Sequence, residues 1–173
     1  MKVYDGTAAE SEPTVEPERI KVGIAESKVS HADAVLTTSG LGSCLGVAVY
    51  DDEADVAGLL HVMLPSIDEM EGKNEAKFAD SGIRDLVDEM ERLGAERERM
   101  EAKIAGGSDM LDFSESGSGI GVRNVERGRQ TLAEFDIPIV GEDVGGDHGR
   151  SLRLETRTGD LIVKSANRDA ITL

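Results

Sequence analysis

The chain contains one cysteine, Cys44, and three glycines surround it in the segment TTSGLGSCLGVAVYD. Gly40, Gly42 and Gly46 let the backbone turn sharply and approach a ligand closely. Successive N–H groups in such a turn can point at one spot, which is how an oxyanion is stabilised in acyl transfer. A lone intracellular cysteine is more often a small buried hydrophobe. The residues around Cys44 alone therefore leave both a catalytic and a structural interpretation open.

A histidine, His61, follows the cysteine in the apolar run GLLHVML. If residues 45–51 and 56–64 form a hairpin, His61 lies on the strand next to the cysteine turn. A neighbouring imidazole can take the proton of a thiol and return it to a leaving group. The competing interpretation is a core histidine whose ring nitrogens bond to backbone groups. A third polar group normally orients such a histidine, and the upstream candidates are the hydroxyls of Thr37, Thr38 and Ser39.

The charge balance of the 173-residue chain excludes some functions. With 35 acidic and 19 basic residues, its formal net charge is -16, and the acids are spread along the whole sequence. Such a surface repels nucleic acids and anionic membranes. Scattered acids with few lysines and aromatics also favour a protein adapted to a high-salt cytoplasm, in which salt screens the self-repulsion. We therefore expect a halophilic source.

The sequence predicts neither a metal site nor a membrane segment. One cysteine excludes an internal disulfide and a cysteine-rich zinc site. The other two histidines, His31 and His148, lie in polar segments that predict solvated loops. The chain has no apolar run approaching the ~18 to 20 residues of a membrane span, and its start lacks the apolar region of a secretory signal. We expect a cytoplasmic protein without metal, cofactor or membrane insertion.

Periodicity predicts one α/β domain after an acidic leader. Residues 1–18 are rich in Glu, Pro, Ser and Thr, which predicts disorder, and a single domain is expected over residues 19–173. Apolar spacings of three and four predict two main helices. Alternating or β-branched runs predict the strands. The predicted helices cover residues 73–93 and 120–135, and the predicted strands cover residues 20–30, 45–51, 56–64, 100–107, 137–144, 151–157 and 160–166. Residues 34–40 are expected to lead into the glycine turn.

The chain resembles the CheD family of prokaryotic chemotaxis, which are chemoreceptor glutamine deamidases. The resemblance runs from about Ile20 to Lys164 and is carried, in order, by LGSCLGVAVYD, GLLHVMLP, AKIAGGSDM, IGVRN and GGDHGRSLRLETRTGDLIVK. It implies a layered α/β sandwich of mixed and antiparallel strands with two main helices. It also implies that Cys44 is the nucleophile, His61 the general base and Thr38 the hydroxyl that completes a triad.

The resemblance implies hydrolysis of receptor glutamine side chains to glutamate through a thioester on Cys44, without a cofactor. From the composition of the turn, we expect the amides near Gly42 and Ser43 to bind the oxyanion. The family also implies a complex with the CheC phosphatase, and the chain is expected to be a monomer that binds its partner one-to-one. Two alternatives remain: a regulatory partner of CheC with little or no catalysis, and a cysteine peptidase that shares the nucleophile and base.

Overall fold

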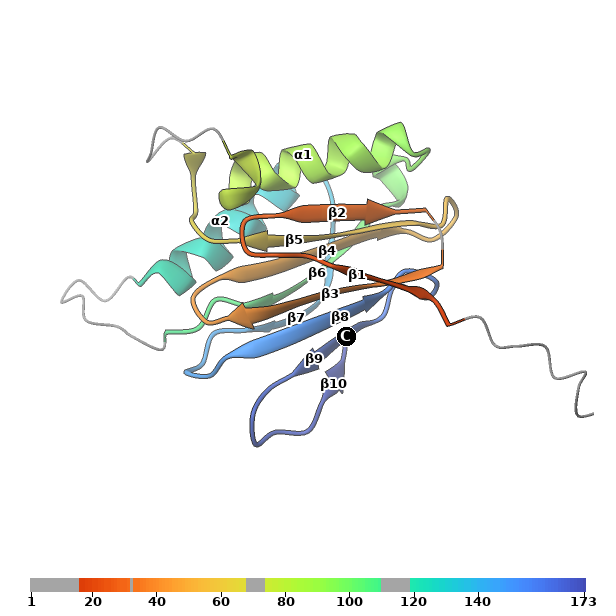
Figure 1. Ribbon diagram of the computed structural model, residues 1–173. Coiled ribbons are helices and arrows are strands. Elements are labelled where there is room, and N and C mark those ends of the chain that lie inside the picture. The colour runs from red at the N-terminus through yellow and green to blue at the C-terminus, as the bar shows by residue number, and fades with distance from the viewer. Residues whose placement is uncertain (1–15, 32, 68–73, 110–118) are drawn as a thin grey trace, which may run out of the picture.

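A computed structural model of the protein shows three stacked layers, namely a pair of helices, a central sheet and an outer sheet (Figure 1). The structure describes residues 16–31, 33–67, 74–109 and 119–173. The outer sheet, sheet A, contains in spatial order β1 (Glu18–Lys21), β3 (Ala34–Leu41), β8 (Arg150–Glu155), β9 (Leu161–Lys164) and β10 (Ile171–Thr172). The central sheet, sheet B, contains β2 (Ser27–Ser30), β5 (Val56–Val62), β4 (Leu45–Asp51), β6 (Glu101–Gly106) and β7 (Ile139–Val144).

Two α-helices cover the face of sheet B that points away from sheet A. They are α1 (Ala79–Arg92) and α2 (Ile120–Glu134), and two 3-10 helices, η3 (Glu75–Lys77) and η4 (Arg97–Arg99), flank α1. The predicted layered α/β sandwich with mixed strands and two main helices is therefore confirmed. No helix in the described part of the chain has both the length and the apolar character needed to cross a membrane.

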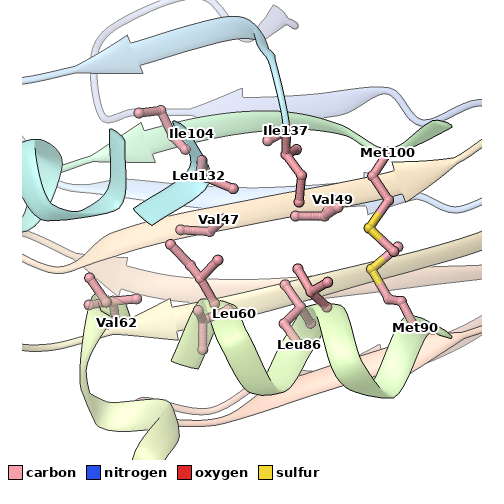
Figure 2. Close-up of a cluster of buried hydrophobic side chains, with 14 of the residues drawn as sticks. Val47, Val49, Leu60, Val62, Leu86, Met90, Met100, Ile104, Leu132 and Ile137 are labelled. Carbon is pink, nitrogen blue, oxygen red and sulfur yellow. The ribbon is translucent and has the colours of Figure 1, made fainter. Parts of the chain in front are cut away.

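Sheet B lies between two apolar cores, so its middle strands are buried on both faces. Along β5 the side chains alternate: Leu60 and Val62 pack toward the helices, whereas Leu59 packs toward sheet A. Figure 2 shows the helix-side core, where Met90 of α1 lies against Met100. Leu132 of α2 belongs to the same cluster. Because both faces of β4 and β5 are covered, this hairpin is a rigid support for residues at its ends.

The apolar stripes of the helices agree with the predicted ones except at their ends. Leu93 follows α1 and is 38% exposed, and Ile120 at the start of α2 is 36% exposed. Gly94 ends α1 with a φ of 103°, which glycine reaches without steric cost, and the Ala95 amide donates a hydrogen bond to the Met90 carbonyl (3.1 Å).

Several predicted elements differ from the structure in their boundaries. Residues 20–30, predicted as one strand, form β1 and β2 in different sheets, because the chain reverses at Ala25 (φ 60°). The first helix begins at Ala79 rather than at residue 73, which lies outside the described residues. Strand β10 was not predicted. Residues 1–15 of the predicted leader lie outside the described residues. Strand β1 begins at Glu18, which was predicted as the last residue of the leader.

Candidate active site

Cys44 lies where the chain crosses from sheet A to sheet B. Strand β3 ends in a bulge between Thr38 and Leu41, and β4 begins at Leu45 in the other sheet. The crossing needs a backbone that few residues adopt: Gly40 has a φ of 77°, and its carbonyl accepts a hydrogen bond from the Gly42 amide (3.2 Å). Gly40 therefore allows the tight turn by which the chain passes from sheet A to sheet B.

Three consecutive carbonyls in this turn are fixed by other elements. The donors come from the segment after β6 and from helix α2. The three hydrogen bonds run from the Ser108 amide to the Gly42 oxygen (2.8 Å), from Asn124 Nδ2 to the Ser43 oxygen (2.9 Å) and from the Gly107 amide to the Cys44 oxygen (2.8 Å). Such a backbone is held in one conformation, which an oxyanion site requires.

The amide groups of the same turn are less engaged than its carbonyls. The Gly42 amide is used by Gly40, whereas the Ser43 and Cys44 amides make no backbone hydrogen bond within the described residues. Of the two expected oxyanion donors, Ser43 thus has its N–H available and Gly42 does not. Cys44 itself offers a second available N–H beside its own sulfur.

His61 is fully buried in the layer between the two sheets, and Thr38 is its partner there. The Oγ1 atom of Thr38 lies 2.7 Å from Nδ1 of His61. Because side chains alternate along β3, Thr37 and Ser39 point to the opposite face of sheet A, where both line a surface pocket. Of the three hydroxyl candidates, Thr38 is therefore the one that contacts the imidazole.

Cys44 and His61 face the same layer. Gly46 pairs with His61 across the hairpin, and Cys44 precedes Gly46 by two residues, so its side chain leaves the sheet on the same side. Its contacts agree, since Cys44 packs against the core between the sheets. The hairpin therefore brings the thiol and the imidazole to one side of sheet B as diagonal neighbours.

Burial keeps both groups in their neutral forms at neutral pH. It raises the pKa of the Cys44 thiol above its ordinary value of 9.0. It lowers the pKa of His61 below its ordinary value of 6.5, because a charged form loses hydration energy when it is buried. The Nε2 atom of His61 is buried and has no hydrogen-bond partner within the described residues. The pair can act as a thiol and a neutral base.

A pocket of about 350 Å³ opens beside the cysteine turn. Its walls come from the turn itself, from the segment after β6 and from the first turn of α2. The wall is tight, since a side chain at Gly121 would collide with the carbonyls of Gly107 and Ser108. The lining residues are Gly42, Ser43, Ser108, Asp109, Gly119, Ile120 and Gly121. A substrate side chain entering here would arrive beside Gly42 and Ser43 of the cysteine turn.

Asn124 is a site residue that the sequence reasoning missed, although it lies in the IGVRN motif. It is 0% exposed, and its Nδ2 atom donates both to the Ser43 carbonyl and to the Met63 carbonyl (3.0 Å). One amide thus ties the cysteine turn to the strand that carries His61. A signal was present: Asn124 falls on the buried stripe of α2, where a polar side chain needs a specific partner.

The other candidate residues lie away from this cluster. His31 is exposed as predicted and lines a pocket with Asp33 and Arg157. His148 lies in the loop between β7 and β8, but its side chain is only 18% exposed, so it is less solvated than predicted. Among the described residues, no three His, Cys, Asp or Glu side chains come together as a metal site would require.

Comparisons with known proteins agree with this architecture. A protein of Haloarcula marismortui, named a probable chemoreceptor glutamine deamidase CheD, is 64% identical over 100% of both chains. A protein of the same name from Natronomonas pharaonis is 46% identical over 90% of this chain and 93% of its own. The one from Moorella thermoacetica is 44% identical over 91% and 96%.

A solved structure shares the fold. The crystal structure of a Neisseria meningitidis protein of the DUF152 family matches 77% of this chain and 64% of that chain, with a TM-score of 0.50 and 12% identity. This chain thus spans less than two thirds of that protein. The family model described as CheD chemotactic sensory transduction matches residues 63–165. Together with the identity to the Haloarcula protein over the full chain, this match shows that the chain belongs to the CheD family.

Proposed function

We propose that this protein hydrolyses the side-chain amide of glutamine residues in chemoreceptors, yielding glutamate and ammonia. The names of its relatives state this activity for those proteins. The observation that carries the proposal here is the contact of Thr38 Oγ1 with His61 Nδ1 in the layer that also receives the Cys44 side chain. A thiol, a neutral base and a group that orients the base are the parts needed for amide hydrolysis without a metal.

The first half of the reaction forms a thioester. His61 Nε2 takes the proton of the Cys44 thiol, and the sulfur attacks the carboxamide carbon of the glutamine. The C–N bond then breaks, and the proton held by His61 goes to the departing nitrogen, which leaves as ammonia. His61 suits this role because its lowered pKa keeps it unprotonated at neutral pH, ready to accept the proton.

The second half regenerates the enzyme. A water molecule gives a proton to His61 and attacks the thioester carbon. The C–S bond breaks, the Cys44 sulfur recovers the proton, and the receptor keeps a glutamate side chain. A methyl-glutamate ester passes through the same thioester, so ester hydrolysis is a second reaction open to this site.

In both halves of the reaction, hydrogen-bond donors must stabilise the negative charge on the oxygen of the tetrahedral intermediate. We assign this role to the amides of Ser43 and Cys44, which make no backbone hydrogen bond within the described residues. The turn carbonyls are held by Gly107, Ser108 and Asn124, so these amides keep their direction when charge develops. Donors that need no reorganisation contribute most to stabilising such a charge.

Further aspects of the proposal follow family membership. The protein acts in the cytoplasm on the cytoplasmic domains of receptors and binds CheC. Independently of the family, we propose that it is a monomer that binds its partner one-to-one. The acidic composition and the Haloarcula relative indicate a protein that works at high salt. All assays therefore belong in molar potassium chloride.

The test is ammonia release from a purified receptor cytoplasmic domain, comparing wild type with Cys44→Ala and His61→Ala. Mass spectrometry of the receptor locates each Gln-to-Glu conversion, and the same spectra reveal any cleaved backbone. Conversion by wild type alone supports the proposal. Receptor fragments would instead identify a peptidase, and an inactive wild type that still stimulates CheC would identify a regulatory partner.

A further inference from the structure

The outer face of sheet A is uncovered in the described part of the chain. Both helices lie on the far side of sheet B, as Figure 1 shows. Side chains that alternate with the buried ones therefore point to solvent from β1, β3, β8 and β9. They line a shallow pocket of about 200 Å³.

This pocket is basic, although the protein is strongly acidic. Four cationic side chains line it, and no Asp or Glu does, in a chain whose net charge is -16. Hydroxyls of Thr37, Ser39 and Ser151 lie between the cations. The four cations are Arg19, Lys21, Arg153 and Lys164.

The cations of this pocket are largely unpaired. Arg19, Lys21 and Lys164 make no ion pair within the described residues. Arg153 has one carboxylate nearby, that of Glu155 at 3.7 Å, while its Nε atom is buried and has no hydrogen-bond partner there. The exposed donors of Arg19, Lys21 and Lys164 are available to an anionic ligand.

The basic face leads to the cysteine turn. Ser151 and Lys164 also line a neighbouring pocket of about 430 Å³, whose wall includes Gly40. The Gly40 carbonyl accepts a hydrogen bond from the amide of Gly42, and Gly42 lines the pocket beside the cysteine turn. Thr38, the partner of His61, lies in the wall of the basic pocket itself. A ligand on this face therefore lies against the strand that carries part of the site.

We propose that this basic face, defined by Arg19, Lys21, Arg153 and Lys164, binds an acidic segment of the substrate protein and so positions the target glutamine at Cys44. The inference rests on the proposed function. The occupant is a protein segment because the cations come from three strands in a row of four, spaced ~4.8 Å apart, which matches several separate carboxylates. Nucleic acid is disfavoured because the rest of the acidic surface repels a long polyanion.

The high salt concentration of the assay determines how the basic face can act on the receptor. At 1 M salt the Debye length is about 3 Å, so the basic face acts through direct contacts rather than long-range attraction. Its loss should raise the KM for the receptor and leave kcat nearly unchanged, because the reacting groups are untouched.

The experiment compares wild type with the double variant K21E/K164E on the receptor domain in molar potassium chloride. Both lysines are exposed, so folding is preserved. Exposed contacts of this kind are weak singly, and we expect KM to rise roughly fivefold to tenfold, with kcat within about twofold. Lys28→Glu on β2 is the matched control, because Lys28 is exposed on the other sheet, and it should leave KM unchanged.

A second measurement separates this inference from the proposed function. Cys44→Ala and the triple variant C44A/K21E/K164E are titrated against the same receptor domain by calorimetry, which needs no turnover. Weaker binding by the triple variant supports the basic face even if wild type releases no ammonia. An unchanged KM and unchanged binding would overturn it, as would an equal loss in Lys28→Glu or equal competition by duplex DNA.

Discussion

Thr38 and His61 belong to different sheets, and the 2.7 Å contact between Thr38 Oγ1 and His61 Nδ1 crosses the buried layer between them. If Nδ1 carries the ring proton and donates it to the hydroxyl oxygen, Nε2 keeps its lone pair for the thiol. With the proton on Nδ1, the contact with the hydroxyl holds the ring in the tautomer in which Nε2 is the base.

Replacing Thr38 by Val should lower kcat about 10- to 100-fold, which is less than the ~10²–10⁴ contributed by a general base. Valine keeps the shape and removes the acceptor, so the imidazole loses its fixed tautomer. KM should stay unchanged, and Thr38→Ser, which restores the hydroxyl, should recover most of kcat. Steady-state ammonia release measures both constants. Equal rates for the Val and Ser variants would exclude this role of the hydroxyl.

The pH dependence of kcat/KM should be a broad bell. Activity rises with pH as His61 loses its proton, and this limb lies below pH 6.5 because burial lowers the pKa of His61. Activity falls where the Cys44 thiol ionises, and this limb lies above pH 9.0 because burial raises its pKa. The check is an ammonia assay from about pH 5 to 10, the range that covers both groups.

Alkylation of Cys44 gives an independent reading of the same pKa. The rate with iodoacetamide follows the thiolate fraction, so it should be low at neutral pH and still climb above pH 9.0. A rate that is already at its maximum at neutral pH would mean that the resting site holds a thiolate and an imidazolium.

Asn124→Ala should lower both stability and kcat. The carbonyls of Ser43 and Met63 lose their donor, which costs about 1–3 kcal/mol of unfolding free energy, and the cysteine turn loosens. Thr131→Val is the control, because Thr131 lies on the same buried stripe but its hydroxyl donates to the Arg127 carbonyl of its own helix (2.8 Å). Denaturant unfolding and ammonia release are measured on both variants. Similar kcat values in the two variants would show that Asn124 contributes to stability but not to catalysis.

Gly106→Ala should reduce activity more than its backbone strain alone explains. Gly106 has a φ of 114°, and a Cβ there would collide with the carbonyl oxygen of Cys44, which must then move with the turn. Gly94→Ala imposes a comparable φ of 103° where nothing lies within 4 Å. Both variants should lose about 1 kcal/mol or more of stability. Only Gly106→Ala should also lower kcat, and equal kcat values would contradict the prediction.

Local patterns were sufficient to predict the hairpin and both helices. The strands 45–51 and 56–62 are β-branched and apolar, and the helices have spacings of three and four, so each element is specified by its own residues. The prediction for residues 20–30 was wrong because their alternation of apolar and polar residues continues across the reversal at Ala25, although Gly23 lies just before it.

The candidate site could be predicted only where the residue type and its local sequence are themselves distinctive. Cys44 and its glycines are unusual in any context. The role of Asn124 depends on how α2 packs over the turn, a tertiary fact that periodicity does not contain. The choice of Thr38 over its neighbours needed the face of β3, and the engagement of the Gly42 amide needed the fold of the turn.

The burial of β5 on both faces has a further consequence for His61. Every residue of this strand is buried, and all the others are apolar or glycine, so no alternation of polar and apolar residues specifies its register. A slip by one residue would turn His61 toward the helices and away from Thr38, leaving a buried polar group without its partner. His61 therefore helps to fix the alignment of β5 in the central sheet, and His61→Leu, which removes the base, would also remove this constraint on how the strand pairs.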